Sequence, residues 1–263
     1  MGGLIDIGVN FTDKAFAKDL STVINRAVEN GVDRFIVTGT QLEELSQAIN
    51  ICEQHPNNCY FTVGIHPHYS KQWQQHYTDK LKQLAIHANA VAIGETGLDF
   101  NRNFSTPEQQ LFAFEEQLKL AVELQMPVFL HEREAHEQQV KLLKKYNNEL
   151  KGGVAHCFTG NERELMAYLE LGLYIGITGW ICDERRGQEL QKLAPKIPLD
   201  RLLLETDAPY LLPRNLKPKP KSRRNEPAHL PHICEQVAEL LSISTQELIE
   251  QTRQNSEILF CLG

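Results

Sequence analysis

Short apolar tracts recur along the chain, and they do not alternate polar with apolar residues as half-exposed strands do. There are eight of them, LIDIGV from residue 4, RFIVTG from 34, YFTVGI from 60, AVAIG from 90, PVFL from 127, GGVA from 152, LYIGITG from 173 and LLLET from 202. Tracts of this kind are typical of strands that are buried on both faces, which is the pattern of a parallel sheet.

The segments between the tracts have the periodicity and start signals of helices. In TPEQQLFAFEEQLKLAVEL, Thr106 can cap the helix, Pro107 suits its first turn, and Leu111, Phe114 and Leu118 share one face. Further helices are predicted at about 13–30, 41–54, 77–88, 134–148, 161–171 and 185–194, with a helical tail at about 230–259. Strands and helices that alternate in this way predict the α/β class and a (β/α)8 TIM barrel, one domain over residues 1–263.

Composition narrows the setting of this barrel. No run approaches the roughly 20 apolar residues of a membrane span, and MGGLIDIGV lacks the features of a signal peptide. The six cysteines form no CxxC pair, which favours reduced thiols. We therefore expect a cytoplasmic protein with no membrane contact. No glycine-rich nucleotide loop follows any tract, so no organic cofactor is expected, and a barrel that closes its own sheet edges can be a monomer.

A polar residue stands at the end of each tract or just past it. These residues are Asn10, Thr40, His66, Glu95, His131, His156, Thr178 and Asp207. Because the carboxyl ends of barrel strands converge on one mouth, we expect these side chains to meet there. An acid such as Glu95, directly after the buried VAIG, is costly unless it is paired or holds a metal. Three histidines and two acids at one register of five strands predict a metal site.

A basic segment follows the last tract. PRNLKPKPKSRRNEPAHLP, residues 213–231, carries Arg214, Lys217, Lys219, Lys221, Arg223 and Arg224 in a chain whose formal net charge is -7. A solvated loop is the ordinary interpretation of such a run. Its position at the mouth favours contact with a phosphate backbone, because an acidic protein needs a local basic patch to hold a polyanion.

Motifs along the whole chain resemble the TatD-type metal-dependent deoxyribonucleases of the amidohydrolase superfamily. They are DIGVN at 6–10, TVGIHPH at 62–68, AIGETGLDF at 92–100, PVFLH at 127–131, HCFTG at 156–160, YIGITG at 174–179, ETDAPYL at 205–211 and RRNEPAHLP at 223–231. The resemblance implies a nuclease that hydrolyses phosphodiester bonds, a 3′ to 5′ exonuclease on single-stranded DNA or RNA, with a role in DNA repair or DNA degradation.

The resemblance also implies roles for the residues at the mouth. Glu95, His131 and His156 would hold one divalent ion, and Asp207 would take the proton of a metal-bound water or ligate a second ion. His66 would hydrogen-bond the phosphate or help the leaving oxygen depart. The other residues expected to contact substrate are Asn10, Arg214, Lys221, Arg223 and Arg224. Magnesium is expected, with manganese or zinc as alternatives because imidazole donors suit them.

The first strand departs from the family pattern. Many members begin with an HxH pair where this chain has Gly8 and Asn10. Glycine has no side chain to coordinate and asparagine is a weaker ligand than imidazole, so the first of two metal positions is expected to be weakened or filled only with substrate. Glu205, two residues before Asp207, is interpreted as a salt-bridge residue of the rim.

Two other functions remain open at this point. A metal-dependent deacylase or amidohydrolase, for example one acting on aminoacyl-tRNA, would use the same mouth. The missing HxH pair would also suit a nucleic-acid binder whose metal site has decayed, although Glu95, His131, His156 and Asp207 argue against it.

Overall fold

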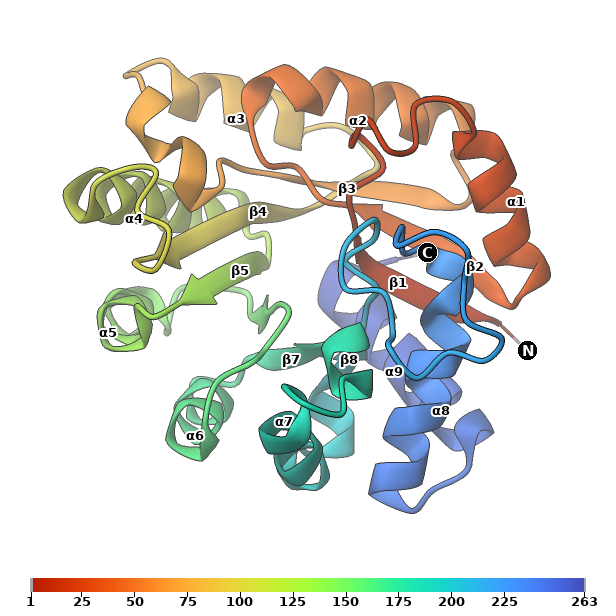
Figure 1. Ribbon diagram of the computed structural model, residues 1–263. Coiled ribbons are helices and arrows are strands. Elements are labelled where there is room, and N and C mark those ends of the chain that lie inside the picture. The colour runs from red at the N-terminus through yellow and green to blue at the C-terminus, as the bar shows by residue number, and fades with distance from the viewer. Residues whose placement is uncertain (1, 263) are drawn as a thin grey trace.

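Eight parallel strands form the centre of the molecule (Figure 1). The computed structural model describes residues 2–262. Its strands are β1 (Leu4–Val9), β2 (Val32–Val37), β3 (Cys59–Val63), β4 (Ala90–Asp99), β5 (Val128–Arg133), β6 (Gly153–Ala155), β7 (Tyr174–Ile177) and β8 (Leu202–Leu204). They follow one another in sequence order, and a parallel bridge from Val9 to Ala208 brings the end of β8 to β1. The sheet is therefore a nearly closed barrel, as the apolar tracts predicted.

Helices surround the strands (Figure 1). They are α1 (Leu20–Glu29), α2 (Leu42–Gln54), α3 (Tyr77–Ala85), α4 (Pro107–Leu124), α5 (His136–Tyr146), α6 (Glu162–Glu170), α7 (Gln188–Leu193), α8 (Leu230–Leu241) and α9 (Thr245–Phe260). Short 3-10 turns lie at η1 (Pro67–Gln72), η2 (Gly179–Cys182), η3 (Ala194–Lys196), η4 (Leu199–Arg201) and η5 (Pro227–His229). In residues 2–262 no helix is both long and apolar enough to cross a membrane.

Several elements differ from the sequence prediction, and two of the differences have a clear local reason. The first helix starts at Leu20 instead of near 13, because the Asp13 carboxylate accepts a hydrogen bond from Ala15 N (2.7 Å) and favours a turn. The helical tail is two helices, since Ser242, directly after α8, has a φ of 57° and Ser244 caps α9. Strand β4 runs on to Asp99, so Glu95 lies inside the strand.

Helix α9 covers the amino-terminal end of the barrel. Leu259, Phe260 and Leu262 belong to the same apolar cluster as the barrel-interior residues Ile7 and Phe129. Polar contacts fix the helix there: Arg253 donates to Gly3 O just before β1 (2.7 Å), and Asn255 donates to Leu202 O at the start of β8 (2.8 Å). The apolar floor leaves the opposite, carboxyl end of the strands for polar side chains.

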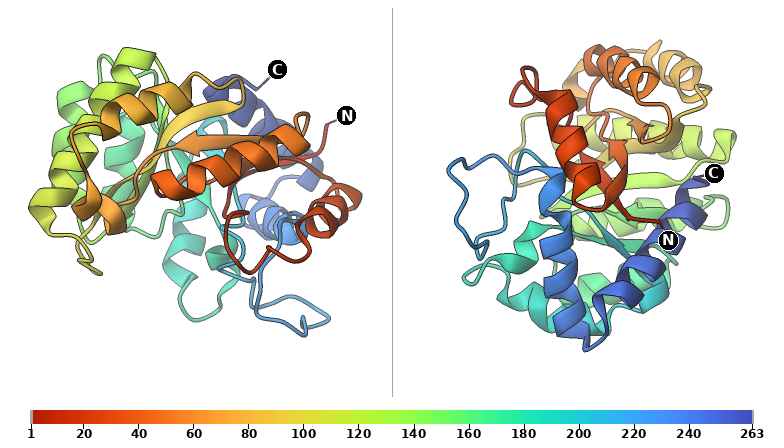
Figure 2. Two further views of the ribbon diagram at one scale, coloured as in Figure 1. Left: turned by 90° about the horizontal axis from the view of Figure 1, so that it is seen from above. Right: turned by 90° about the vertical axis from the view of Figure 1, so that its right-hand side faces the viewer.

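The basic loop after β8 projects from the barrel (Figure 2) and is anchored at its far end by Arg224. The Arg224 guanidinium makes two hydrogen bonds to the Asp19 carboxylate (2.8 and 2.9 Å), one to Glu226 (2.6 Å) and one to Ala15 O (2.7 Å). Its plane also lies 5.3 Å from the ring centroid of Phe16. These contacts tie the loop to the segment before α1.

The near end of the loop is anchored by Arg214. Its guanidinium bonds to Glu184 (3.2 and 3.3 Å) and lies 3.5 Å from Asp183, in the segment before α7. Between the two anchors lie exposed cations that make no hydrogen bond or ion pair within residues 2–262: Lys217, Lys219, Lys221 and Arg223. The six basic residues thus divide into two that hold the loop and four that face solvent.

Replacing Arg224 with alanine should lower the free energy of unfolding by about 2 kcal/mol at pH 7, because several charge-assisted hydrogen bonds are removed. The hydrogen bonds from Arg224 lower the pKa of Asp19, so this stabilisation exists above the usual aspartate pKa of about 4 and fades as the pH falls through the lower folded-state value. Urea unfolding of wild type and Arg224→Ala should therefore differ less at about pH 3 than at pH 7.

Arg223→Ala is the matched control, since Arg223 is the adjacent arginine and is exposed. It should leave the unfolding curve unchanged at both pH values. An equal loss of stability in both variants, or a loss in Arg224→Ala that does not shrink in acid, would contradict the anchoring role.

Candidate functional site

Three histidines surround one carboxylate at the carboxyl end of the barrel. Glu95 is 6% exposed, and its Oε1 lies 3.3 Å from His66 Nε2, 2.9 Å from His131 Nδ1 and 3.2 Å from His156 Nε2. His66 follows β3, Glu95 lies in β4, His131 lies in β5, and His156 follows β6. Four consecutive strands of the barrel therefore each supply one member of the cluster, as the sequence predicted.

Close backbone packing brings β3 and β4 together here. A Cβ at Gly64, just after β3, would lie 2.4 Å from the carbonyl carbon of Gly94 on β4, so position 64 has no room for a side chain. The backbone N–H of Glu95 donates to Gly39 O (2.7 Å), and that of His66 donates to Thr40 O (2.8 Å). These bonds hold Glu95 and His66 against the segment that follows β2, at the mouth of the barrel.

The charges of the cluster favour an ionised Glu95. Burial alone would raise the pKa of this carboxyl, but His66 and His156 outweigh it and hold the pKa well below its usual range. Burial lowers the pKa of His66 to about 4. Burial would also lower the pKa of His131, but hydrogen bonds to Asp99 and Glu95 outweigh it and raise that pKa to about 9. The carboxylates of Glu205 and Glu95 raise the pKa of His156 well above its usual value against the effect of burial.

His66 differs from the other two histidines in its tautomer. The backbone N–H of His68 donates to His66 Nδ1 (3.1 Å). In a neutral ring the proton must then sit on Nε2, the atom that faces Glu95. A protonated Nε2 is a hydrogen-bond donor and not a metal ligand. His66 is therefore suited to donate to an oxygen atom, although its ligand atom lies within 4.8 Å of those of Glu95 and His131.

Two buried carboxylates orient the other histidines. Asp99 Oδ2 lies 3.4 Å from His131 Nε2 and 2.8 Å from His68 Nε2. Glu205 is 0% exposed, and its Oε2 lies 2.8 Å from His156 Nδ1. Glu205 therefore forms a salt bridge, as predicted, but the expectation that it lies on the rim is wrong, because the residue is fully buried. Neither carboxylate was predicted in this role.

Asp207 follows β8 on the other side of the mouth. The side-chain amide of Asn10 donates to Asp207 Oδ1 (2.9 Å). Burial raises the pKa of Asp207 to about 7; His156 opposes the rise, and Glu95 and Glu205 add to it. Within residues 2–262 no hydrogen bond or ion pair joins Asp207 to the Glu95 cluster. Asp207, which was predicted as a further metal ligand, is thus a separate carboxyl group that can gain or lose a proton near neutral pH.

The donors of the cluster suit a divalent metal ion. The ligand atoms of His66, Glu95 and His131 lie within 4.8 Å of one another, and His156 Nε2 lies 3.2 Å from Glu95 Oε1. Imidazole and carboxylate groups are ligands for zinc, manganese and iron, and an ion would displace protons from the histidines on binding. The residues present therefore fit the divalent metal that the sequence predicted.

The predicted substrate contacts are spread more widely. Lys221 and Arg223 are exposed on the projecting loop, whereas Arg214 and Arg224 are engaged in the two anchors. Whether any of the four touches substrate stays a prediction. Asp99 could have been found from the sequence, because it lies four residues after Glu95 on one strand and so shares its face.

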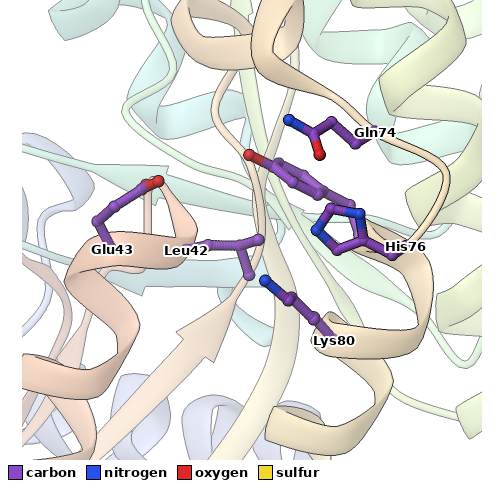
Figure 3. A pocket seen from close by; sticks show the side chains of 6 residues that line it. Leu42, Glu43, Gln74, His76 and Lys80 are labelled. Atoms are coloured by element: carbon purple, nitrogen blue, oxygen red, sulfur yellow. The ribbon is translucent and has the colours of Figure 1, made fainter.

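A separate hollow of about 420 Å³ lies between the starts of α2 and α3 (Figure 3). Its lining consists of Leu42, Glu43, Gln74, His76, Tyr77 and Lys80. It includes none of the predicted site residues and has one carboxylate beside one ammonium group. The histidine cluster is therefore the better candidate for chemistry.

Comparisons with known proteins agree on one family. A model of the family described as "TatD related DNase" matches residues 5–261. The protein named 3'-5' ssDNA/RNA exonuclease TatD of Erwinia tasmaniensis is 56% identical over 98% of this chain and 100% of its own length. The protein of the same name from Yersinia pseudotuberculosis is 53% identical, again over 98% of this chain and 100% of its own.

Solved structures are also similar. A hydrolase TatD family protein from Entamoeba histolytica superposes with a TM-score of 0.90 at 30% identity, covering 100% of this chain and 99% of that one. The TatD homologue YJJV of Escherichia coli gives a TM-score of 0.89 at 29% identity, with coverage of 99% and 98%. With a family match that spans nearly all of its residues, this chain belongs to the TatD-related DNase family.

Proposed function

We propose that the protein is a metal-dependent 3′ to 5′ exonuclease that hydrolyses phosphodiester bonds in single-stranded DNA or RNA. Relatives that carry this activity in their names are 52 to 56% identical over almost the whole chain. The observation that carries the proposal is the buried, ionised Glu95 with His131 and His156 beside it at the barrel mouth. This site can hold a divalent ion at the place where barrel enzymes bind substrate.

Glu95, His131 and His156 would hold the ion. When bound, it would polarise a phosphoryl oxygen and lower the pKa of a water molecule. Magnesium is the ion that the family resemblance suggests, and manganese or zinc are alternatives that imidazole donors favour.

The protein's own groups would handle the proton and the phosphate. Asp207, with a pKa of about 7, can accept a proton on Oδ2 while Asn10 holds Oδ1. His66 would donate its Nε2 proton to a phosphate oxygen or to the leaving oxygen. Beside them Phe104 is 54% exposed, with its ring edge-on to His68 at 4.8 Å between centroids. An exposed ring there would stack on an unpaired base, which suits a single strand.

The free cations of the loop would bind the phosphate backbone. Lys221 and Arg223 are the predicted contacts that are exposed and unpaired within residues 2–262, and Lys217 and Lys219 extend the same row. Arg214 and Arg224 would act indirectly by holding the ends of the loop.

We also propose where the protein acts and in what form. We place the protein in the cytoplasm as a monomer of one domain without an organic cofactor. Its six cysteines are free, the barrel nearly closes its own edges, and the family match spans residues 5–261. Either DNA repair or DNA degradation would use such an exonuclease.

A single-stranded oligonucleotide labelled at its 5′ end should be shortened from its 3′ end by wild type with magnesium. Chelator or Glu95→Ala should reduce kcat/KM by about a thousand-fold or more, because several kcal/mol of transition-state stabilisation depend on the ion. Glu43→Ala, an exposed acid on α2, should behave as wild type.

Other outcomes would favour the alternatives. Cleavage that survives Glu95→Ala would place the chemistry elsewhere. Turnover of an aminoacyl ester without cleavage of the oligonucleotide would favour the deacylase. Binding without cleavage, equal with and without metal, would favour a nucleic-acid binder.

Replacing Lys221 and Arg223 with alanine should weaken binding of single-stranded DNA and reduce its dependence on salt. For every phosphate group that the variant no longer neutralises, the slope of log Kd against log salt should fall by about 0.7. Fluorescence anisotropy between about 50 and 200 mM salt would measure the slope. Lys192→Ala, on the exposed side of α7, is the control for removal of a positive charge elsewhere. An unchanged slope in the double variant would remove the loop from the substrate site.

A further inference from the structure

The Glu205 carboxylate lies between two glycines of the neighbouring strands. A Cβ added at Gly8 on β1 would lie 2.4 Å from Glu205 Oε2, and one added at Gly176 on β7 would lie 2.5 Å from Oε1. Both distances are far shorter than a non-bonded contact between a carbon and an oxygen atom. Each oxygen therefore occupies the space that a side chain at the adjacent glycine would need.

Both oxygens of this carboxylate are also engaged by donors. Oε2 lies 2.8 Å from His156 Nδ1, and Oε1 accepts a hydrogen bond from the backbone N–H of Cys157 (2.6 Å). With Nδ1 donating to Glu205, His156 Nε2 faces Glu95. Because Glu205 is 0% exposed, water cannot replace these bonds.

The backbone around Glu205 leaves the carboxylate little freedom to move. Its N–H donates to Ile177 O on β7 (3.0 Å), and the Asp207 N–H donates to Gly8 O on β1 (2.9 Å). The next residue, Thr206, is held through its N–H and hydroxyl by Asp6 on β1 (2.9 and 2.5 Å). A side chain at position 8 would have to displace the Glu205 head group itself.

We propose that Glu205 is a positioning residue that orients His156 for a divalent ion, and that Gly8 and Gly176 provide the space that this requires. The inference rests on the metal site of the proposed function.

This arrangement predicts the effect of three substitutions on manganese binding. Gly8→Ala should push the carboxylate away from His156 and weaken binding by about 10- to 100-fold, the usual effect of removing a partner of a metal ligand. Gly176→Ala should act in the same way through Oε1. Glu205→Gln should also weaken binding, because its NH₂ group would face either His156 Nδ1–H or Cys157 N–H.

The decisive experiment is a double-mutant cycle on the full chain, with Mn²⁺ affinity and stoichiometry measured by titration calorimetry. Wild type, Gly8→Ala, Glu205→Ala and the double variant are compared after circular dichroism has verified that each is folded. If Gly8 acts through Glu205, adding Gly8→Ala to Glu205→Ala should change the affinity by less than about twofold.

Glu29→Ala is the control for loss of a carboxylate elsewhere, because Glu29 is exposed at the end of α1; it should bind Mn²⁺ as wild type does. If both glycine variants fail to fold, Glu205→Gln and Glu205→Ala decide, and unchanged affinity in both overturns the proposal. Additive losses in the cycle overturn it as well. Wild type that binds no Mn²⁺ overturns the metal site of the proposed function too, whereas normal binding without cleavage overturns only the nuclease.

Discussion

The rest of the site depends on one costly feature, a carboxylate ionised inside a strand. Glu95 lies in β4 at 6% exposure, where an unpaired charge would strongly destabilise the fold. The imidazoles of His66, His131 and His156 offset that cost. Asp99 in turn lies beside the His131 ring, and Glu205 pairs with the His156 ring. Each buried charge in the site therefore has a neighbour of opposite charge.

The sequence was sufficient to predict the barrel and the meeting of Glu95 with the three histidines. Both follow from buried strands and from the common direction of their carboxyl ends. The roles of Glu205 and Arg224 could not be predicted in this way. Glu205 is one of two acidic residues just after β8, and Arg224 is one of six basic residues in the loop. Their partners can be identified only when the space between the strands and the path of the loop are known. Glu205 depends on space left by Gly8, and Arg224 on the turn around Asp19.

The basic loop shows how an acidic chain can present positive charge in one place. Its terminal arginines, Arg214 and Arg224, are neutralised by carboxylates of the neighbouring loops. The charges between them remain exposed. The same residue type therefore serves to fix the loop at its ends and to generate a local positive potential at its tip, which the formal net charge of -7 conceals.

The position of α9 has a consequence for biosynthesis. Leu259 and Phe260 of this helix, with Leu262 just after it, complete the apolar interior that β1 begins. A ribosome delivers these residues after all eight strands, so the barrel cannot exclude water from its floor until they have emerged. Until then the strands that carry the histidines lack the apolar residues that pack against their amino-terminal ends. A prematurely terminated chain would for this reason be an unfolded substrate for cellular proteases, and not an unregulated hydrolase.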